Sequence, residues 1–510
     1  MSMQQAPYFA GPSGVQRLKM FVNGEWIESK TDEYSPVYNA STGEVTTEAP
    51  RCLPEEVDRA VAAAKAAFGP WSETPVQERV QVLFKFKALL DAHLDEIATI
   101  LATENGKTHA EAVGSIQRGI EITEFACGAP TLMMGESLEN VSHGLDVVTW
   151  RQPLGVCVGI VPFNFPAMIP MWMFPISIAC GNTFVLKAAS MVPNTAARLM
   201  ELLTEAGLPK GVVNMITCGR ESVKLLIEHP DVKSISFVGS TSVGLEIYQT
   251  AAAHGKRVQA LTEAKNHALV MPDCVLPRAA QGIVNAAFGC AGERCMALPT
   301  IVAHERIADE LVQLILAAAI QIQVGPAEDP HTTMGPLVSS EHREGVVRWI
   351  ETGVKEGGEL VLDGRNLTVL DYENGFYLGP TIFDHVTEDM SIGREEIFGP
   401  VLCIKRAKSF EEGLAIINAS RFGNGSAIYT QSGRYAREFA HRVGAGMVGI
   451  NVGIPVPLGF FSFTGWKQSF FGDLHSHGKD GVLFYTEKKS VSYRWFEEAD
   501  AKVKKVGTWD

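Results

Sequence analysis

Residues 154–161 read LGVCVGIV, and residues 183–187 read TFVLK. Similar short apolar runs return as VVNMI at 212–216 and as SISFV at 234–238, with helical stretches at 195–206 and 242–254. This alternation of short strands and helices is typical of βαβ units, in which the strands are parallel and helices cover the sheet. The region that begins at residue 154 therefore predicts a doubly wound parallel sheet.

The rest of the chain adds further elements around this region. A second alternating series begins at His267–Met271 and continues through 276–288, 300–303 and 307–321, so we expect two α/β domains rather than one. Near the start, Asn23-Gly24 lies between two apolar runs and predicts a two-residue hairpin. Pro54 opens a predicted helix, and a longer amphipathic helix is predicted over 76–103, with Gly106 as its left-handed cap.

Composition excludes several classes of protein. The chain has 510 residues, a net charge of −14 and 46% hydrophobic residues, which is typical of a globular protein and argues against disorder. The acidic balance offers no electrostatic footprint for nucleic acid or an anionic membrane. Nine cysteines, an odd number without any CxxC pair, suit a reducing compartment, and the first twenty residues lack the pattern of a secretory signal. We therefore expect a cytoplasmic protein.

One long apolar segment needs a separate test. Between residues 152 and 190 the only charge is Lys187, but Pro162, Pro166, Pro170 and Pro175 interrupt the segment. A helix in lipid would lose several backbone hydrogen bonds at those prolines. We expect a buried strand, a loop and a buried helix here, with no membrane partner.

Cys295 is the strongest candidate for chemistry. It lies in FGCAGERC (288–295), where a predicted helix ends in a loop of small residues, and Arg294 places positive charge beside the sulfur. Both features favour an accessible thiolate, the nucleophilic form of cysteine. The alternative interpretation is a small hydrophobic residue in the core, which is the commoner role of cysteine.

Two further stretches point to ligands more weakly. Asn164 follows the strand of 154–161, at the sheet edge where ligands bind in open α/β folds, and its carboxamide is a donor suited to an oxyanion. An asparagine that bonds its own turn explains the residue equally well. The string FVGSTSVG (237–244) is a strand, a glycine turn and a helix start that offers free N–H groups to a phosphate. His475 and His477 lack partners at ligand spacing, so no metal site is expected.

Together these strings resemble the aldehyde dehydrogenase superfamily over about residues 20–495. FNFP (163–166), Lys187, FVGSTSVG, GERC (292–295) and EEIFGP (395–400) stand in family order and at family spacing. Within the superfamily the chain is similar to the CoA-acylating branch, the methylmalonate-semialdehyde dehydrogenases. The marks of the branch are GERC, LTEAKN (261–266) and the long aromatic run from Gly459 to His475.

The resemblance implies a fold and a set of domains. It implies a Rossmann-type dinucleotide-binding domain of residues 18–134 and 154–261 and a second α/β catalytic domain of residues 262–460. A β arm of residues 135–153 and 484–497 would mediate assembly into a homo-oligomer, which we expect to be a tetramer, and residues 498–510 would form a tail.

The resemblance also implies roles for individual residues. Cys295 would attack the aldehyde, and Asn164 with the Cys295 N–H would hold the oxyanion. NAD would be the cofactor, with Lys187 on the adenosine ribose, Ser240 near the pyrophosphate and Glu396 on the nicotinamide ribose. The cofactor cleft would be lined by Val161, Phe163, Thr262 and Phe398. Ser190 stands where the branch has an acidic residue, so NAD is favoured with weaker discrimination against NADP.

One departure separates two reaction types. Hydrolytic members carry a glutamate as general base in a string like ELGGK, and alignment on Lys265 puts Leu261 at that position. Since leucine cannot activate water, the thioester should persist until a thiol such as that of CoA attacks it. Glu263, two residues away, is the alternative base and would make the enzyme hydrolytic.

The substrate that the branch implies is a semialdehyde with a second carboxylate. Arginine suits a planar carboxylate, and the residues that match the branch are Arg118 and Arg294. Malonate semialdehyde would yield acetyl-CoA, and methylmalonate semialdehyde would yield propionyl-CoA, each with loss of CO2. The sequence leaves open which of the two is preferred, since one methyl group is worth about 1–3 kcal/mol.

Overall fold

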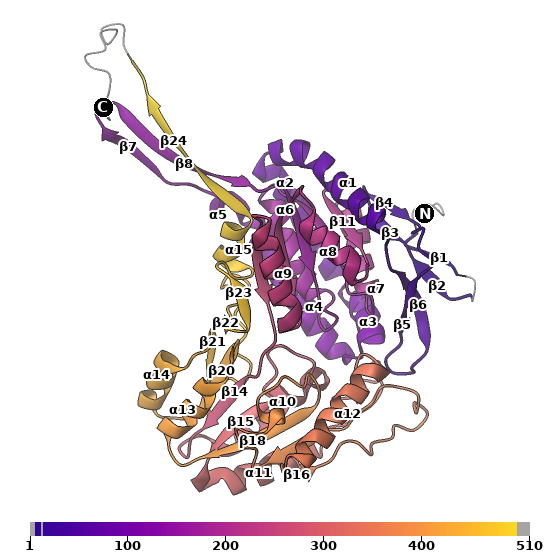
Figure 1. Cartoon of the computed structure of the whole chain (residues 1–510), viewed down its shortest axis with the longest axis vertical. Helices are drawn as coiled ribbons and strands as arrows, with labels where there is room; N and C mark the ends of the chain where they lie inside the picture. The colour runs from indigo at the N-terminus through magenta and orange to yellow at the C-terminus, as the bar shows by residue number, and fades with distance from the viewer. Residues whose placement is uncertain (1–5, 12–13, 497–510) are drawn as a thin grey trace.

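The fold of the chain is described by a computed structural model that covers residues 6–11 and 14–496 (Figure 1). Two large sheets, each covered by helices, lie one above the other, and a thin three-stranded arm projects from the body (Figure 1). The helices are α1 (Pro54–Glu73), α2 (Val76–Ala92), α3 (Leu94–Asn105), α4 (His109–Cys127), α5 (Ala129–Leu132), α6 (Met168–Ala179), α7 (Asn194–Glu205), α8 (Arg220–Glu228), α9 (Thr241–Ala253), α10 (Leu276–Phe288), α11 (Glu305–Ala319), α12 (Ser340–Lys355), α13 (Phe410–Ala419), α14 (Gly433–Arg442) and α15 (Gly478–Phe484).

The first large sheet has eight strands in the order β23-β13-β12-β9-β10-β11-β3-β4. Its strands are β3 (Met20–Val22), β4 (Glu25–Ile27), β9 (Val156–Ile160), β10 (Thr183–Lys187), β11 (Val213–Ile216), β12 (Val232–Val238), β13 (Arg257–Leu261) and β23 (Phe470–Gly472). The five strands from β9 to β13 are parallel. Helices α1, α8 and α9 pack on one face and α6 on the other, which confirms the predicted doubly wound sheet.

The order of these strands places a ligand crevice. From β9 the chain adds β10 and β11 on one side and then returns to add β12 and β13 on the other. The strand order therefore reverses between β9 and β12. In open α/β sheets a ligand binds outside the carboxyl ends of the strands at such a reversal.

The second large sheet has seven strands in the order β16-β17-β18-β15-β14-β20-β21, all parallel except β16. They are β14 (His267–Val270), β15 (Thr300–His304), β16 (Glu359–Leu362), β17 (Thr381–Asp384), β18 (Val401–Ala407), β20 (Gly425–Tyr429) and β21 (Met447–Ile450). Helices α10, α11 and α12 bury one face, and α13 and α14 bury the other. The expected second α/β unit is present.

Smaller sheets complete the molecule. A four-stranded sheet joins β1 (Tyr8–Ala10), β2 (Gln16–Leu18), β5 (Tyr34–Tyr38) and β6 (Val45–Pro50), and β19 (Phe422–Gly423) pairs with β22 (Trp466–Lys467). The projecting arm consists of β7 (Ser137–Ser142), β8 (Leu145–Pro153) and β24 (Thr486–Arg494). The domain limits given above stay a prediction, and the tail of residues 498–510 lies outside the described residues.

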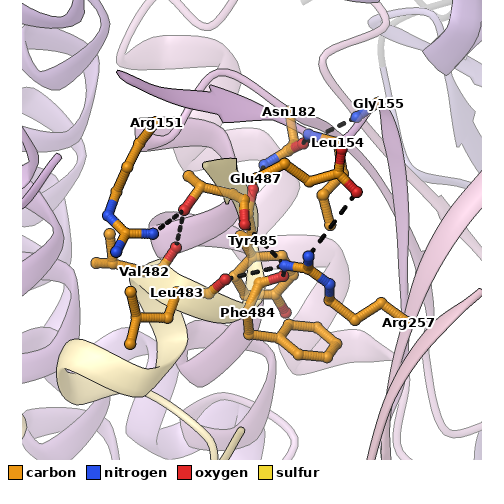
Figure 2. Close-up of polar contacts among 11 residues, drawn as sticks. Arg151, Leu154, Gly155, Asn182, Arg257, Val482, Leu483, Phe484, Tyr485 and Glu487 are labelled. Atoms are coloured by element: carbon orange, nitrogen blue, oxygen red, sulfur yellow. Dashed lines mark hydrogen bonds and ion pairs between the residues drawn. The ribbon is translucent and has the colours of Figure 1, made fainter. Parts of the chain in front are cut away.

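A partly buried polar network fastens the arm to the first sheet (Figure 2). The Arg257 guanidinium donates to the carbonyls of Leu483 and Phe484 at 2.9 and 2.8 Å, and also to that of Thr486 at 2.7 Å. Asn182 donates to the Tyr485 carbonyl at 2.8 Å and accepts from the N–H groups at the start of β9. The chain therefore leaves α15 and enters β24 along a fixed path.

Some of the predicted turns and helices are confirmed, and one predicted helix is wrong. The hairpin at Asn23-Gly24 is present, with positive φ at both residues, and Gly106 caps α3 at φ 90°. The single helix predicted over 76–103 is wrong, because the chain forms α2 and α3 with a break at His93. His477 directly precedes α15, where it is buried and has φ 46°.

Candidate active site

The site lies where the two large sheets face each other. Phe163 and Asn164 follow β9, Ser240 follows β12 and Thr262 follows β13, all at the carboxyl edge of the first sheet. The opposite wall is the amino edge of the second sheet. There Asn266, Cys295, Glu396 and Asn424 precede β14, β15, β18 and β20. The topology thus gathers at one crevice several residues that are far apart in the sequence.

The loop that carries Cys295 has an unusual backbone. After α10, three consecutive residues adopt left-handed conformations: Cys290 at φ 51°, Ala291 at φ 50° and Gly292 at φ 73°. A Cβ on Gly292 would lie 2.2 Å from the Gly399 carbonyl oxygen, so the loop packs directly on the EEIFGP stretch. Non-glycine residues in this region are strained, and such strain persists only where the surroundings hold it.

Two carboxamides fix the Cys295 backbone. Asn266 Nδ2 donates to the Cys295 carbonyl at 2.9 Å, and Asn424 Nδ2 donates to the same oxygen at 3.1 Å. The thiol itself lies in a partly accessible position. Burial and the nearby Glu396 carboxylate raise the pKa of Cys295 to about 12, whereas the backbone N–H groups of Cys295 and Met296 and the Lys107 ammonium act to lower it. In this state the thiol is therefore predominantly protonated.

Asn164 approaches the loop that carries Cys295 from the first sheet. Its Nδ2 donates to the Glu293 carbonyl at 3.0 Å, which leaves the second N–H of the amide for a ligand. The Asn164 carbonyl accepts from the buried Lys107 ammonium, which also donates to Asn105 Oδ1 at 2.9 Å. Asn105 in turn donates to the Phe163 carbonyl at 3.0 Å. The turn that presents Asn164 is thus held by the side chains of Asn105, the last residue of α3, and Lys107, which lies between α3 and α4.

Glu396 and Phe398 form the opposite wall with His342. Glu396 Oε1 accepts from the Ala264 N–H at 3.0 Å, and burial together with Glu263 raises the pKa of Glu396 to about 8. The rings of Phe163 and Phe398 meet edge to face with centroids 5.7 Å apart. His342 Nε2 bonds the Phe398 carbonyl at 2.7 Å, and Phe398 itself has φ 59°. These contacts join the two sheets across the crevice.

The remaining predicted cofactor residues also line the carboxyl edge of the first sheet. Val161 is buried at the end of β9, and Ser190 is partly exposed a few residues after β10. Lys187 ends β10, and its ammonium has no hydrogen-bond or ion-pair partner within residues 6–11 and 14–496, although burial lowers its pKa. A desolvated cation without a partner fits a site for a polar ligand. The residues present therefore fit a dinucleotide laid across this edge.

Comparisons with known proteins agree with this arrangement. A sequence model of the aldehyde dehydrogenase family matches residues 26–491. The chain belongs to the aldehyde dehydrogenase family. It is 52% identical over 483 residues to malonate-semialdehyde dehydrogenase 1 of Geobacillus thermodenitrificans, an alignment that covers 95% of this chain and 100% of the relative.

Solved structures give the same result for the fold of this aldehyde dehydrogenase. A methylmalonate-semialdehyde dehydrogenase from Oceanimonas doudoroffii superposes with a TM-score of 0.93 at 44% identity, covering 94% of this chain and 99% of that one. A candidate methylmalonate-semialdehyde dehydrogenase from Sinorhizobium meliloti 1021, solved with NAD, gives 0.94 at 43% identity, covering 95% and 99%. The predicted resemblance and fold class are confirmed.

In this aldehyde dehydrogenase, two residues bear on whether the reaction is hydrolytic. Leu261 argues against hydrolysis, whereas Glu263 is the alternative base. Leu261, which is predicted to stand at the position of the hydrolytic base, ends β13 and is 4% exposed. Glu263 lies beyond the strand, where its Oε2 accepts from the Thr241 N–H at 3.2 Å. Glu263 is not part of the strand, because β13 ends at Leu261. Its carboxylate instead stands at the N-terminus of α9.

The two predicted carboxylate-binding arginines both have acidic partners. Arg294 donates to Glu111 Oε1 at 3.1 Å, and its guanidinium lies against Gly289, where a Cβ would meet it at 2.6 Å. Arg118 lies on α4 and donates to Glu121 Oε2 at 2.9 Å on the same helix. No contact joins the two guanidinium groups within the described residues. Their role toward a substrate stays a prediction.

Several supporting residues escaped sequence analysis. Lys107, Asn105, Asn266 and Asn424 all hold backbone atoms of the site, as described above. Asn105-Gly-Lys107 directly precedes Thr108, the N-cap of α4. This pattern predicts the start of a helix, but it does not indicate that these residues lie close to Cys295. Only the fold brings these residues to the crevice.

Among the described residues, no helix has the length and apolar character needed to cross a membrane.

Proposed function

We propose that this aldehyde dehydrogenase oxidises malonate semialdehyde or methylmalonate semialdehyde with NAD and transfers the decarboxylated acyl group to CoA. The products are acetyl-CoA or propionyl-CoA. The observation that carries the proposal is Leu261: where hydrolytic members carry their base, this chain has a buried apolar side chain, in the same hydrophobic cluster against which Cys295 packs. The names of the relatives, which are malonate- and methylmalonate-semialdehyde dehydrogenases, support the choice of substrate.

The first half of the reaction makes a thioester. The Cys295 thiolate attacks the aldehyde carbon, and the second N–H of Asn164 with the Cys295 backbone N–H stabilises the oxyanion. NAD, when bound, supplies the oxidant that accepts the hydride from this carbon. Lys187, Ser240 and Glu396 would hold it, with Val161, Phe163, Thr262 and Phe398 along the cleft. Collapse of the oxyanion then leaves an acyl group on the Cys295 sulfur.

The second half releases the acyl group to a thiol. The substrate carboxylate leaves as CO2, its electron pair forms the thioester enolate, and a proton from solvent completes the methyl or ethyl group. The CoA thiolate then attacks the thioester carbonyl and expels the Cys295 thiolate. Because Leu261 cannot deprotonate water, hydrolysis does not compete at the base position. The sulfur is restored without a further oxidant.

The test measures NADH formation from malonate semialdehyde with and without CoA. We expect steady turnover only with CoA, and without it a single turnover that leaves an acyl adduct on Cys295, detectable by mass spectrometry. Equal steady-state rates in both conditions would contradict the acylating reaction. A comparison of kcat/KM for the two semialdehydes in the presence of CoA identifies the preferred one.

The second candidate function is hydrolytic oxidation to a free acid. Glu263 favours it, because this carboxylate lies two residues from the base position. Its contact with the Thr241 N–H at the start of α9 argues against that role. A hydrolytic enzyme would release free acid without CoA and would lose this activity in the Glu263→Gln variant.

Arg118 and Arg294 are proposed to bind the substrate carboxylate through N–H groups not used by Glu121 and Glu111. Replacement of either by leucine should raise KM for malonate semialdehyde with little effect on propanal. An equal loss for both aldehydes would exclude this role. The measurement is the ratio of the two KM values in each variant.

Three further properties belong to the proposal. Ser190 stands where an acidic residue would repel a 2′-phosphate, so NAD is preferred with modest discrimination against NADP. The arm is proposed to join copies of the chain into a homo-oligomer, a tetramer built from two dimers. All nine cysteines are free, which supports a reducing cytoplasmic location.

A further inference from the structure

The Glu263 carboxylate binds the N-terminus of a helix that lies far from it in the sequence. Helix α9 begins at Thr241, and its N-cap residue Ser240 makes no side-chain capping bond. The acceptor for the Thr241 N–H comes instead from Glu263, 22 residues later, at 3.2 Å. The first N–H groups of a helix attract anions, because they lack partners and carry the positive end of the helix dipole. This helix start already holds an anion that belongs to the protein.

The same helix start faces a small cavity. The cavity has a volume of about 330 Å³, and its polar lining comes from Thr241, Ser242, Glu263, Arg421 and Gln468. Thr241 Oγ1 is buried, and no hydrogen-bond partner for it exists within the described part of the chain. Arg421 is already engaged, since its guanidinium pairs with Glu395 and donates to Gln468 Oε1 at 3.2 Å. Glu263 is thus a group that lines this cavity and whose negative charge opposes an anionic ligand.

The position matters because of the proposed cofactor site. Ser240 and the start of α9 are the proposed site of the dinucleotide pyrophosphate, at the reversal of strand order between β9 and β12. A phosphate oxygen and the Glu263 carboxylate are both acceptors and both negative. One Thr241 N–H cannot serve both of them, and like charges in a desolvated crevice repel.

We propose that Glu263 is an internal competitor of the cofactor phosphates. In the free enzyme it occupies the α9 N-terminus, and the cofactor binds only as this carboxylate moves away. Glu263 therefore lowers the affinity for the dinucleotide and favours its release. This inference rests on the proposed function, because the location of the pyrophosphate site is part of that proposed function.

An independent observation supports this arrangement. Glu396, the proposed ligand of the nicotinamide ribose, accepts from the backbone N–H of Ala264, the residue that follows Glu263. Glu263 also helps to raise the pKa of the Glu396 carboxyl. Two acidic side chains thus flank one end of the proposed cofactor path. Removal of the Glu263 charge should relieve both the competition and this repulsion.

The experiment compares dissociation constants measured by calorimetric titration of the full-length enzyme with NAD and with ADP-ribose. Glu263→Gln keeps the size of the side chain and removes its charge, and Glu263→Ala removes the acceptor as well. We expect both variants to bind both probes about tenfold more tightly, the scale of one carboxylate at a helix N-terminus. The difference in dissociation constant between wild type and variants should become smaller at high salt, since screening weakens the repulsion between Glu263 and the phosphates.

The matched control is Glu246→Gln, which makes the same change of charge on the exposed face of α9, where Glu246 pairs with Arg220. It should leave both dissociation constants unchanged. A damaged fold weakens binding and cannot mimic the expected gain. Equal or weaker binding in the Glu263 variants overturns the inference alone. Absence of binding of either probe to wild type and variants alike overturns the proposed function, and this inference with it.

Discussion

The charge state of Cys295 depends on burial and on a neighbouring carboxyl group. Burial and, after it, the Glu396 carboxylate raise the pKa of the Cys295 thiol, and burial raises the pKa of Glu396 itself to about 8. Above that pH Glu396 is ionised and opposes the thiolate. Glu396→Gln should therefore lower the pKa of Cys295, so that alkylation by iodoacetamide reaches half its maximal rate at a lower pH.

The control for this prediction is the adjacent residue. Glu395→Gln makes the same change of charge, but Glu395 pairs with Arg421. Its alkylation profile should match that of the wild type. An unshifted profile in the Glu396→Gln variant would show that burial alone sets the reactivity of the thiol.

Lys107 positions residues of the site but takes no part in the proposed reaction. Its ammonium is buried and holds both the Asn164 carbonyl and Asn105 Oδ1, and its charge lowers the pKa of Cys295. Lys107→Met leaves two buried acceptors unpaired and frees the turn that carries Asn164. We expect kcat to fall about 10²-fold with a small change in KM, since misplacement of a catalytic donor by about 1 Å has that effect.

Two readouts separate positioning from simple destabilisation. The folded Lys107→Met protein should also alkylate more slowly at Cys295 at a given pH. Lys85→Met, an exposed lysine on α2, should change neither property. Loss of thermal stability with normal kcat would contradict a positioning role for Lys107.

At the residue scale, sequence analysis recovers groups whose neighbours in sequence are distinctive. Cys295 and Glu396 stand in short strings with glycines that the backbone requires, such as Gly292 against Gly399. Lys107 and Asn424 contact the site only through long-range packing, so no local pattern identifies them. The partners of Arg294 and Glu263 could not be predicted either, because Glu111 and Thr241 lie on separate helices.

At the element scale, one guanidinium makes several of the hydrogen bonds at the junction between body and arm (Figure 2). Arg257 donates to three carbonyls, at Leu483, Phe484 and Thr486, where the chain passes from α15 into β24. Arg257→Gln leaves most of these acceptors unpaired. We expect a loss of roughly 2–4 kcal/mol in the free energy of unfolding, measured by urea denaturation.

An exposed arginine provides the comparison. Arg220 pairs with Glu246 at the surface, and Arg220→Gln should cost about 0–1 kcal/mol. Comparable losses in the two variants would mean that the junction contributes no more than a surface ion pair.

Elements with strong local signals were predictable, and those set by packing were not. Turn chemistry at Asn23-Gly24 and the glycine cap at Gly106 need only neighbouring residues. The break between α2 and α3 has no glycine or proline to announce it. His93 ends one helix and begins the next, and its ring bonds Glu96 Oε2 at 2.7 Å. A continuous apolar pattern conceals such a break.

At the scale of the whole molecule, the alternation of strands and helices predicts two sheets but does not give their strand order. The reversal between β9 and β12 places the cofactor crevice, and it follows from how distant segments pair. The facing of one sheet's carboxyl edge toward the other's amino edge is likewise a tertiary property. It explains why residues from Asn105 to Asn424 meet at one site although no single segment contains the site.

The arm gives the last prediction. It projects from the body (Figure 1), and apolar side chains on it face solvent: Leu138 is 64% exposed and Trp150 is 47% exposed. A three-stranded ribbon too thin for a core of its own leaves such residues without a partner inside one chain, and exposed apolar patches mark association surfaces. We expect the wild-type protein to sediment as an oligomer at micromolar concentration. Leu138→Asp with Trp150→Asp should shift it to a smaller species with its secondary structure retained.

Leu370→Asp, at a leucine that is 79% exposed in a loop of the body, should leave the assembly unchanged. A wild-type chain that sediments as a monomer, or an oligomer unaffected by the arm variants, would place the association surface elsewhere.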